Sequence, residues 1–193
     1  MQWQPATGHV PRGFIGAIGS LDEIEAVFVI AEPGNPRDGE QYDEHGDADR
    51  YMEKACGVAR GALASHSSAF HRNVRQALDL FWPQLKHDLD AQLRRVWITE
   101  SVLCSAKITT GPIEAPVWRA CVTDYLAQQL RLLPGRPVFA FGGKAVMRLR
   151  GQVDVMSAVA LAPPGANRRD ALPSWRAAAA AFHATTRRPT ISR

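Results

Sequence analysis

The sequence predicts an α/β fold with three layers, α/β/α, around a central four-stranded parallel sheet. The main observation is a set of short apolar runs, the first of which, residues 27–31, stops at Glu32-Pro33-Gly34. A fully apolar, β-branched run of this length is typical of a buried parallel strand. Amphipathic stretches of helical length separate the runs, so crossover helices are expected on both faces of the sheet.

The N-terminal half begins with a loop-rich arm over residues 1–20, in which glycine and proline recur. After the first strand and a polar segment, a helix is expected at 49–64, because Asp47 or Asp49 can cap it. A second helix is expected at 68–82, where an apolar stripe ends at a proline. A short polar helix or turn is expected over 85–94.

The clearest helix of the C-terminal half spans 117–133, where apolar residues repeat every three to four positions until Pro134-Gly135. The other strands are expected at residues 96–99, 138–141 and 155–161. The other helices are expected at 145–150 and at 173–184, the second of which has a proline in its first turn. A basic tail, 185–193, follows, and the 193 residues are expected to form one domain.

Composition restricts the class of protein. The formal charge of +4 permits a nucleic-acid partner without requiring one. Three cysteines without a CxxC pair favour a reducing compartment, and no secretory signal or membrane-spanning run is evident. We therefore expect a cytoplasmic monomer with no membrane association, no cofactor and no metal.

Two acidic residues follow the first two expected strands. Glu32 comes directly after the first strand and Glu100 directly after the second. In open α/β sheets, ligands bind beyond the carboxyl ends of the strands, so both acids are candidates for a functional site. The alternatives are a structural loop acid for Glu32, a salt bridge for Glu100, and a cation bound between the two.

Three segments carry a family resemblance. They are Ala31-Glu32-Pro33-Gly34, then Ile98 to Cys104 (ITESVLC), and lastly Phe141-Gly142-Gly143-Lys144-Ala145 with Leu161-Ala162-Pro163-Pro164-Gly165. In this order and spacing they resemble the uracil-DNA glycosylase superfamily, over residues 27–182. The resemblance implies that fold and an enzyme of base excision repair, which hydrolyses the N-glycosidic bond of a flipped damaged base in DNA.

The resemblance also implies roles for individual residues. Glu32 would orient or activate water and Glu100 would recognise the base edge, with Ala31, Pro33, Gly34 and Ser101 around the base and Tyr42 stacking on it. Apart from the resemblance, Arg168, Asn167 or Arg169 is a hypothetical donor to the leaving base, and Arg168 could instead contact phosphate. Lys144, in a Gly-Gly-Lys turn at a strand-to-helix junction, and Arg169 are expected to contact DNA. DNA is thus the expected partner.

The sequence departs from the family at three places. Glu100 stands where the family has asparagine. An ionised carboxylate only accepts hydrogen bonds, so it suits a base edge with two donors, as in guanine. A protonated Glu100 could bind uracil. Ala162 or Pro163 stands where the family has a histidine donor. Cys104 and Cys121 lie near two ligand positions of the family's four-cysteine iron–sulfur cluster, which three cysteines cannot complete. The alternative function is a catalytically inactive relative that binds nucleic acid or nucleobases.

Overall fold

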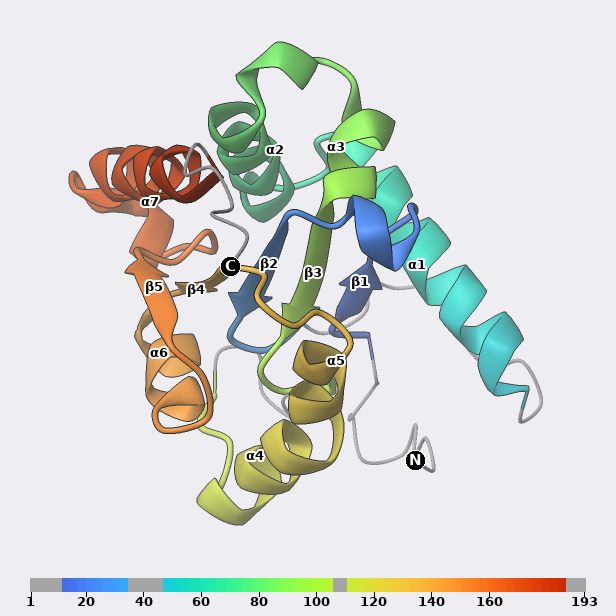
Figure 1. Cartoon of the computed structure of the whole chain (residues 1–193). Helices are drawn as coiled ribbons and strands as arrows, with labels where there is room; N and C mark the ends of the chain where they lie inside the picture. The colour runs from blue at the N-terminus through green and yellow to red at the C-terminus, as the bar shows by residue number, and fades with distance from the viewer. Residues whose placement is uncertain (1–11, 35–46, 106–110, 187–193) are drawn as a thin grey trace, which may run out of the picture.

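A five-stranded mixed sheet forms the centre of the fold in the computed structural model, which describes residues 12–34, 47–105 and 111–186 (Figure 1). The strand order is β1-β3-β2-β4-β5, with β2, β3, β4 and β5 parallel and β1 antiparallel to β3. The strands are β1 Phe14–Gly16, β2 Ala26–Ile30, β3 Val96–Glu100, β4 Val138–Phe141 and β5 Val155–Ala158.

The predicted α/β class is confirmed, but the prediction of a purely parallel four-stranded sheet is wrong. The additional strand, which was not predicted, is β1, and it lies within the segment that we expected to be a loop-rich arm. It has only three residues and ends at Gly16, which has a positive φ of 66°. Such a short segment shows no alternation of apolar and polar residues, so the sequence does not reveal it.

The helices follow the predicted order. They are α1 Ala48–Ala64, α2 Ala69–Phe81, α3 Leu89–Arg95, α4 Ala115–Cys121, α5 Ala127–Arg131, α6 Gly143–Leu149 and α7 Ala171–Thr186. Asp47 caps α1 by accepting hydrogen bonds from two backbone amides, and Ser68 caps α2 by accepting from the backbone amide of His71. The single helix expected over 117–133 is interrupted by a π-helical segment, η4 Val122–Leu126, between α4 and α5.

Helices cover both faces of the sheet, as Figure 1 shows. On one face, α2 and α7 bury an aromatic cluster that includes Phe28 of β2, Phe81 and Phe182. On the other face, α6 and the α4–α5 stretch pack on Val27 and Val29. Both faces of β2 are therefore buried, which explains its uninterrupted apolar sequence.

The strand order fixes where a ligand would bind. The chain passes from β2 to β3 on one side, and then returns to place β4 on the other side of β2. This reversal creates a topological switch point at the carboxyl ends of the central strands, the usual ligand position in open α/β sheets. Among the helices in the described residues, none has the length and apolar character needed to cross a bilayer.

Candidate functional site

The two acids lie at the carboxyl ends of neighbouring strands. Glu100 is the last residue of β3 and is paired in register with Ile30, the last residue of β2. Glu32 follows Ile30 by two residues, and its charge acts on the carboxyl group of Glu100. The parallel register of β2 and β3 therefore brings both carboxyl groups to the same edge of the sheet, at the switch point.

Helix α6 supplies two cations to Glu32. Lys144 and Arg148 are four residues apart and so lie on the same face of the helix. The Nζ atom of Lys144 donates to Oε1 of Glu32, and Nη1 of Arg148 donates to Oε2 over 2.6 Å. The Glu32 side chain is 7% exposed and that of Arg148 is 2% exposed, whereas that of Lys144 is 42% exposed. Glu32 is thus a buried carboxylate whose two oxygens each accept from a different cation.

Arg148 also connects the ends of β2 and β3 through hydrogen bonds. Its Nη1 atom donates to the carbonyl oxygen of Ala31 over 2.9 Å and to Oγ of Ser101 over 3.1 Å. Ser101 in turn donates its hydroxyl proton to the Ala31 oxygen over 2.6 Å. The three groups form a closed set of hydrogen bonds that holds the start of the Glu32 loop against the end of β3.

The turn before α6 depends on a glycine. Gly142, at the end of β4, has φ 99° and ψ 152°, a conformation that is essentially restricted to glycine. A Cβ atom at this position would also lie 3.0 Å from Cβ of Ala160. The tight turn begins α6 directly after β4, which neighbours β2 in the sheet, and so brings Lys144 and Arg148 to Glu32.

Glu100 differs electrostatically from Glu32. It is 5% exposed, and its Oε2 atom is buried without a hydrogen-bond partner. Burial raises the pKa of Glu100 well above its ordinary value, and the negative charge of Glu32 raises it further; Arg12 and Arg148 oppose this shift. Glu100 is therefore expected to be a neutral carboxylic acid, which has one donor and remaining acceptor capacity.

The other residues predicted for the site fall into three groups. Ala31 and Ser101 belong to the hydrogen-bond set around Arg148. Pro33 is buried, while Gly34 is exposed and its carbonyl oxygen accepts from Arg12 over 3.2 Å. Tyr42 lies outside the described residues.

The two arginines expected to act on the base or on DNA are exposed. Arg168 forms two hydrogen bonds with Asp170, of 2.9 Å and 2.6 Å, and Arg169 is its exposed neighbour. The arginine that contacts Glu32 is instead Arg148, which sequence reasoning missed. The sequence feature that could have revealed it is the position of Arg148 on the apolar side of a short helix, beside Leu149 and three residues after Ala145.

The cysteine thiols lie near this region. Burial raises the pKa of Cys104 to about 11, and burial likewise raises the pKa of Cys121, whose sulfur accepts from the backbone amide of Leu103 over 3.2 Å. A metal-binding cysteine must be a thiolate, so these surroundings disfavour ligation. Among the described residues, no group of three or more His, Cys, Asp or Glu side chains could hold a metal ion.

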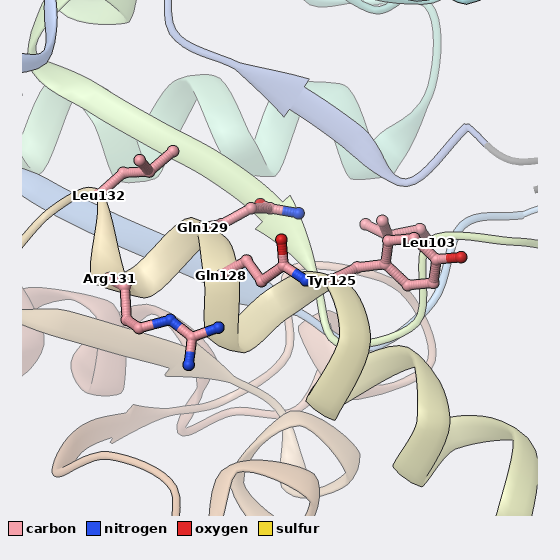
Figure 2. Close-up of a pocket in the computed structure, with 6 residues that line it drawn as sticks. All are labelled: Leu103, Tyr125, Gln128, Gln129, Arg131 and Leu132. Atoms are coloured by element: carbon pink, nitrogen blue, oxygen red, sulfur yellow. The ribbon is translucent and has the colours of Figure 1, made fainter.

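A hollow of about 510 Å³ lies on the surface of η4 and α5, next to Leu103. Figure 2 shows Tyr125, Gln128, Gln129 and Arg131 among the six side chains that line it. None of the acids or cations of the site contributes to this lining. We place the candidate site at the Glu32 and Glu100 cluster, because interacting buried carboxyl groups at strand ends are typical of functional sites.

Comparison with known proteins gives no family: no protein-family model matches the chain, and no curated protein matches it.

Proposed function

We propose that this protein is a uracil-DNA glycosylase-like enzyme, which hydrolyses the N-glycosidic bond of a damaged base flipped out of DNA, a step of base excision repair. The observation that supports it best is the buried pair of carboxyl groups, Glu32 and Glu100, at the carboxyl ends of adjacent parallel strands. One group is an ion-paired carboxylate and the other is neutral, so the pair offers two different functions at one place.

Glu32 is the group proposed to act on water. An ionised carboxylate has about four lone-pair positions, so it can accept from a water molecule as well as from Lys144 and Arg148. The two cations fix its orientation. In the reaction, the water oxygen bonds to C1′ of the sugar, the C1′–N bond breaks, and its electron pair leaves with the base. The water proton passes to Glu32 or to solvent, and the carboxylate stabilises the oxocarbenium-like sugar.

The proposed partner is DNA, contacted at the rim of the site. Lys144 is accessible while it pairs with Glu32, so it can also face a phosphate. Arg169 is exposed, and Arg168 has its charge partly met by Asp170. The overall charge of +4 adds a weak, salt-sensitive attraction.

A second candidate is a relative that binds nucleobases or nucleic acid without excising a base. Two observations favour it. Both oxygens of Glu32 already accept hydrogen bonds from cations, which leaves fewer of its lone pairs for an attacking water. Ala162 and Pro163 provide no side-chain donor for the charge on the leaving base.

Strand-cleavage assays separate the two candidates. Oligonucleotides carrying uracil, hypoxanthine, xanthine or a mismatch are incubated with the protein and then treated with alkali to cut abasic sites. Excision by the wild type that falls on the order of 100-fold in Glu32→Gln supports the first candidate. The matched control is Glu53→Gln, an exposed acid on α1, which should leave the rate unchanged.

Two results would count against the enzyme. Absence of an abasic product from every lesion, together with salt-sensitive DNA binding, supports the second candidate. Excision that survives Glu32→Gln unchanged shows that the acid pair is not the active site. Thermal unfolding of each variant is measured alongside, so that loss of activity is distinguished from loss of the fold.

A further inference from the structure

The hollow on η4 and α5 lies outside the cluster of Glu32 and Glu100. Its volume of about 510 Å³ is within the range of small-molecule sites. Tyr125 belongs to the π-helical segment η4, and such segments are frequent at functional sites. Tyr125 is 39% exposed and Leu132 is 54% exposed, so both leave apolar area open to a ligand. The hollow therefore has the size and the accessible surface of a binding site.

The lining of the hollow is ordered along one side of the helix. Four of its six residues follow the spacing i, i+3, i+4 and i+7, namely Tyr125, Gln128, Gln129 and Leu132. Residues with this spacing share one helical face. In Figure 2 the two glutamine side chains lie between Leu132 at one end and Tyr125 with Leu103 at the other. An aromatic ring, two amides and two leucines thus face the same space.

Neighbouring groups fix the orientation of both glutamine amides. Nε1 of Trp97 donates to Oε1 of Gln129 over 3.0 Å, so the donors of the Gln129 amide nitrogen face a ligand. Nε2 of Gln128 donates to the carbonyl oxygen of Asp124 over 2.6 Å, which leaves Oε1 of Gln128 as the acceptor. The hollow therefore offers one donor group and one acceptor from adjacent residues.

Arg131 gives the hollow its charge. This residue is exposed, and none of the six described residues that line the hollow is acidic. A guanidinium group binds phosphate through charge-assisted hydrogen bonds. The lining is therefore complementary to a ligand that carries a negative charge.

We propose that the hollow binds one unpaired nucleotide, whose base stacks on Tyr125 while its phosphate contacts Arg131. Proteins bind single-stranded nucleic acid by this combination of aromatic stacking and positive charge. The Watson–Crick edge of each base has a donor beside an acceptor, so the two glutamine amides suit any of the four bases. The nucleotide belongs to a DNA strand or is free, since both have the same chemistry. The site goes beyond the proposed excision reaction and shares none of its residues.

Two probes test the site on the full chain: thymidine monophosphate, by titration calorimetry, and a labelled single-stranded oligonucleotide of mixed sequence, by fluorescence anisotropy. Tyr125→Ala should weaken binding on the order of 10-fold, because it removes the stacking surface. The matched control Tyr125→Phe keeps the ring and should bind within about 2-fold of the wild type.

The phosphate contact is tested through salt dependence. Arg131→Gln should weaken oligonucleotide binding and reduce the slope of log K against log salt concentration by about 0.7, because one phosphate contact is lost. The matched control is Arg150→Gln, an exposed arginine outside the hollow, which should leave both quantities unchanged. Thermal unfolding of every variant distinguishes weaker binding from loss of the fold.

Binding that both Tyr125→Ala and Arg131→Gln weaken supports the inference. If only the oligonucleotide shows this effect, the nucleotide belongs to a strand; if both probes show it, the site also accepts a free nucleotide. The inference is overturned if the wild type binds neither probe, or if both variants bind as tightly as the wild type. Neither assay requires excision of a base, so failure of the proposed function would leave this result unchanged.

Discussion

Replacement of Arg148 by methionine tests whether this arginine holds the site together. Methionine keeps the aliphatic length and a similar helix propensity, so the change removes mainly the guanidinium group. Breaking a buried ion pair by removing one partner costs about 3–5 kcal/mol. Arg148 is 2% exposed and its Nη1 atom donates to three acceptors, which places it in this class.

Two features reduce the expected loss. Lys144 still neutralises Glu32 in the variant, and Ser101 still donates to the Ala31 oxygen. We therefore expect Arg148→Met to lower the free energy of unfolding by about 3 kcal/mol, the lower end of the range. Urea denaturation followed by tryptophan fluorescence measures this value. The matched control is Arg150→Met, an exposed arginine at the end of the same helix, which should change stability by less than about 0.5 kcal/mol.

A double-mutant cycle with Glu32→Gln separates the ion pair from the other contacts of Arg148. Because Arg148 and Glu32 form an ion pair, the double variant should be more stable than the sum of the single losses predicts, by about 1–3 kcal/mol. The reasoning fails if Arg148→Met costs less than about 1 kcal/mol, or if the two losses add. Either result would mean that the guanidinium lies in water rather than against Glu32.

Three further predictions concern pH and backbone conformation. Because the pKa of Glu100 is raised above its ordinary 4.5, the unfolded chain loses this proton first, and stability falls as pH rises above that value. Glu100→Gln should therefore be more stable than the wild type at pH 7 and equally stable below pH 4.5. Urea denaturation at both pH values measures the difference, and equal stability of the two proteins at pH 7 would contradict the prediction. Burial raises the pKa of Tyr51 from 10.0 to about 12, so the wild type should lose stability between these two pH values. Tyr51→Phe has no phenol to ionise and should lose less stability over the same range, as thermal unfolding would show. Gly142→Ala should cost about 1–3 kcal/mol in urea, whereas Gly143→Ala, where an added Cβ meets nothing within 4 Å, should not destabilise; similar effects for both would refute the strain argument.

The sequence was sufficient for the central parallel strands β2, β3 and β4 because those strands are almost entirely buried. Strand β4 was predicted at 138–141 and is found at Val138–Phe141, where an apolar run is bounded by Pro137 and Gly142. The fourth predicted strand was too long: 155–161 was expected, but β5 ends at Ala158, because pairing along β4 stops at Phe141. Strand length at a sheet edge depends on the neighbouring strand, which a local pattern does not show.

The site was only partly predictable for a related reason. The rule that ligands bind at strand ends led to Glu32 and Glu100, and the structure places both at adjacent ends. Arg148 could not be paired with Glu32 from the sequence, because 116 residues separate them and the contact depends on the direction in which α6 leaves β4. A buried arginine in a short apolar helix indicates an anionic partner but does not identify it.

The different states of the two acids follow from the topology of the sheet. Strand β2 lies between β3 and β4, so the helix that follows β4 reaches the end of β2, where it provides Lys144 and Arg148 to Glu32. Strand β3 has the antiparallel β1 on its other side, where the charge of Arg12, just before β1, acts on Glu100. Two neighbouring carboxyl groups cannot both remain charged without cost, and it is Glu32 whose two oxygens accept hydrogen bonds from cations. The arrangement of strands thus makes one acid an anion and the other a neutral hydrogen-bonding group, which is the difference that the proposed chemistry requires.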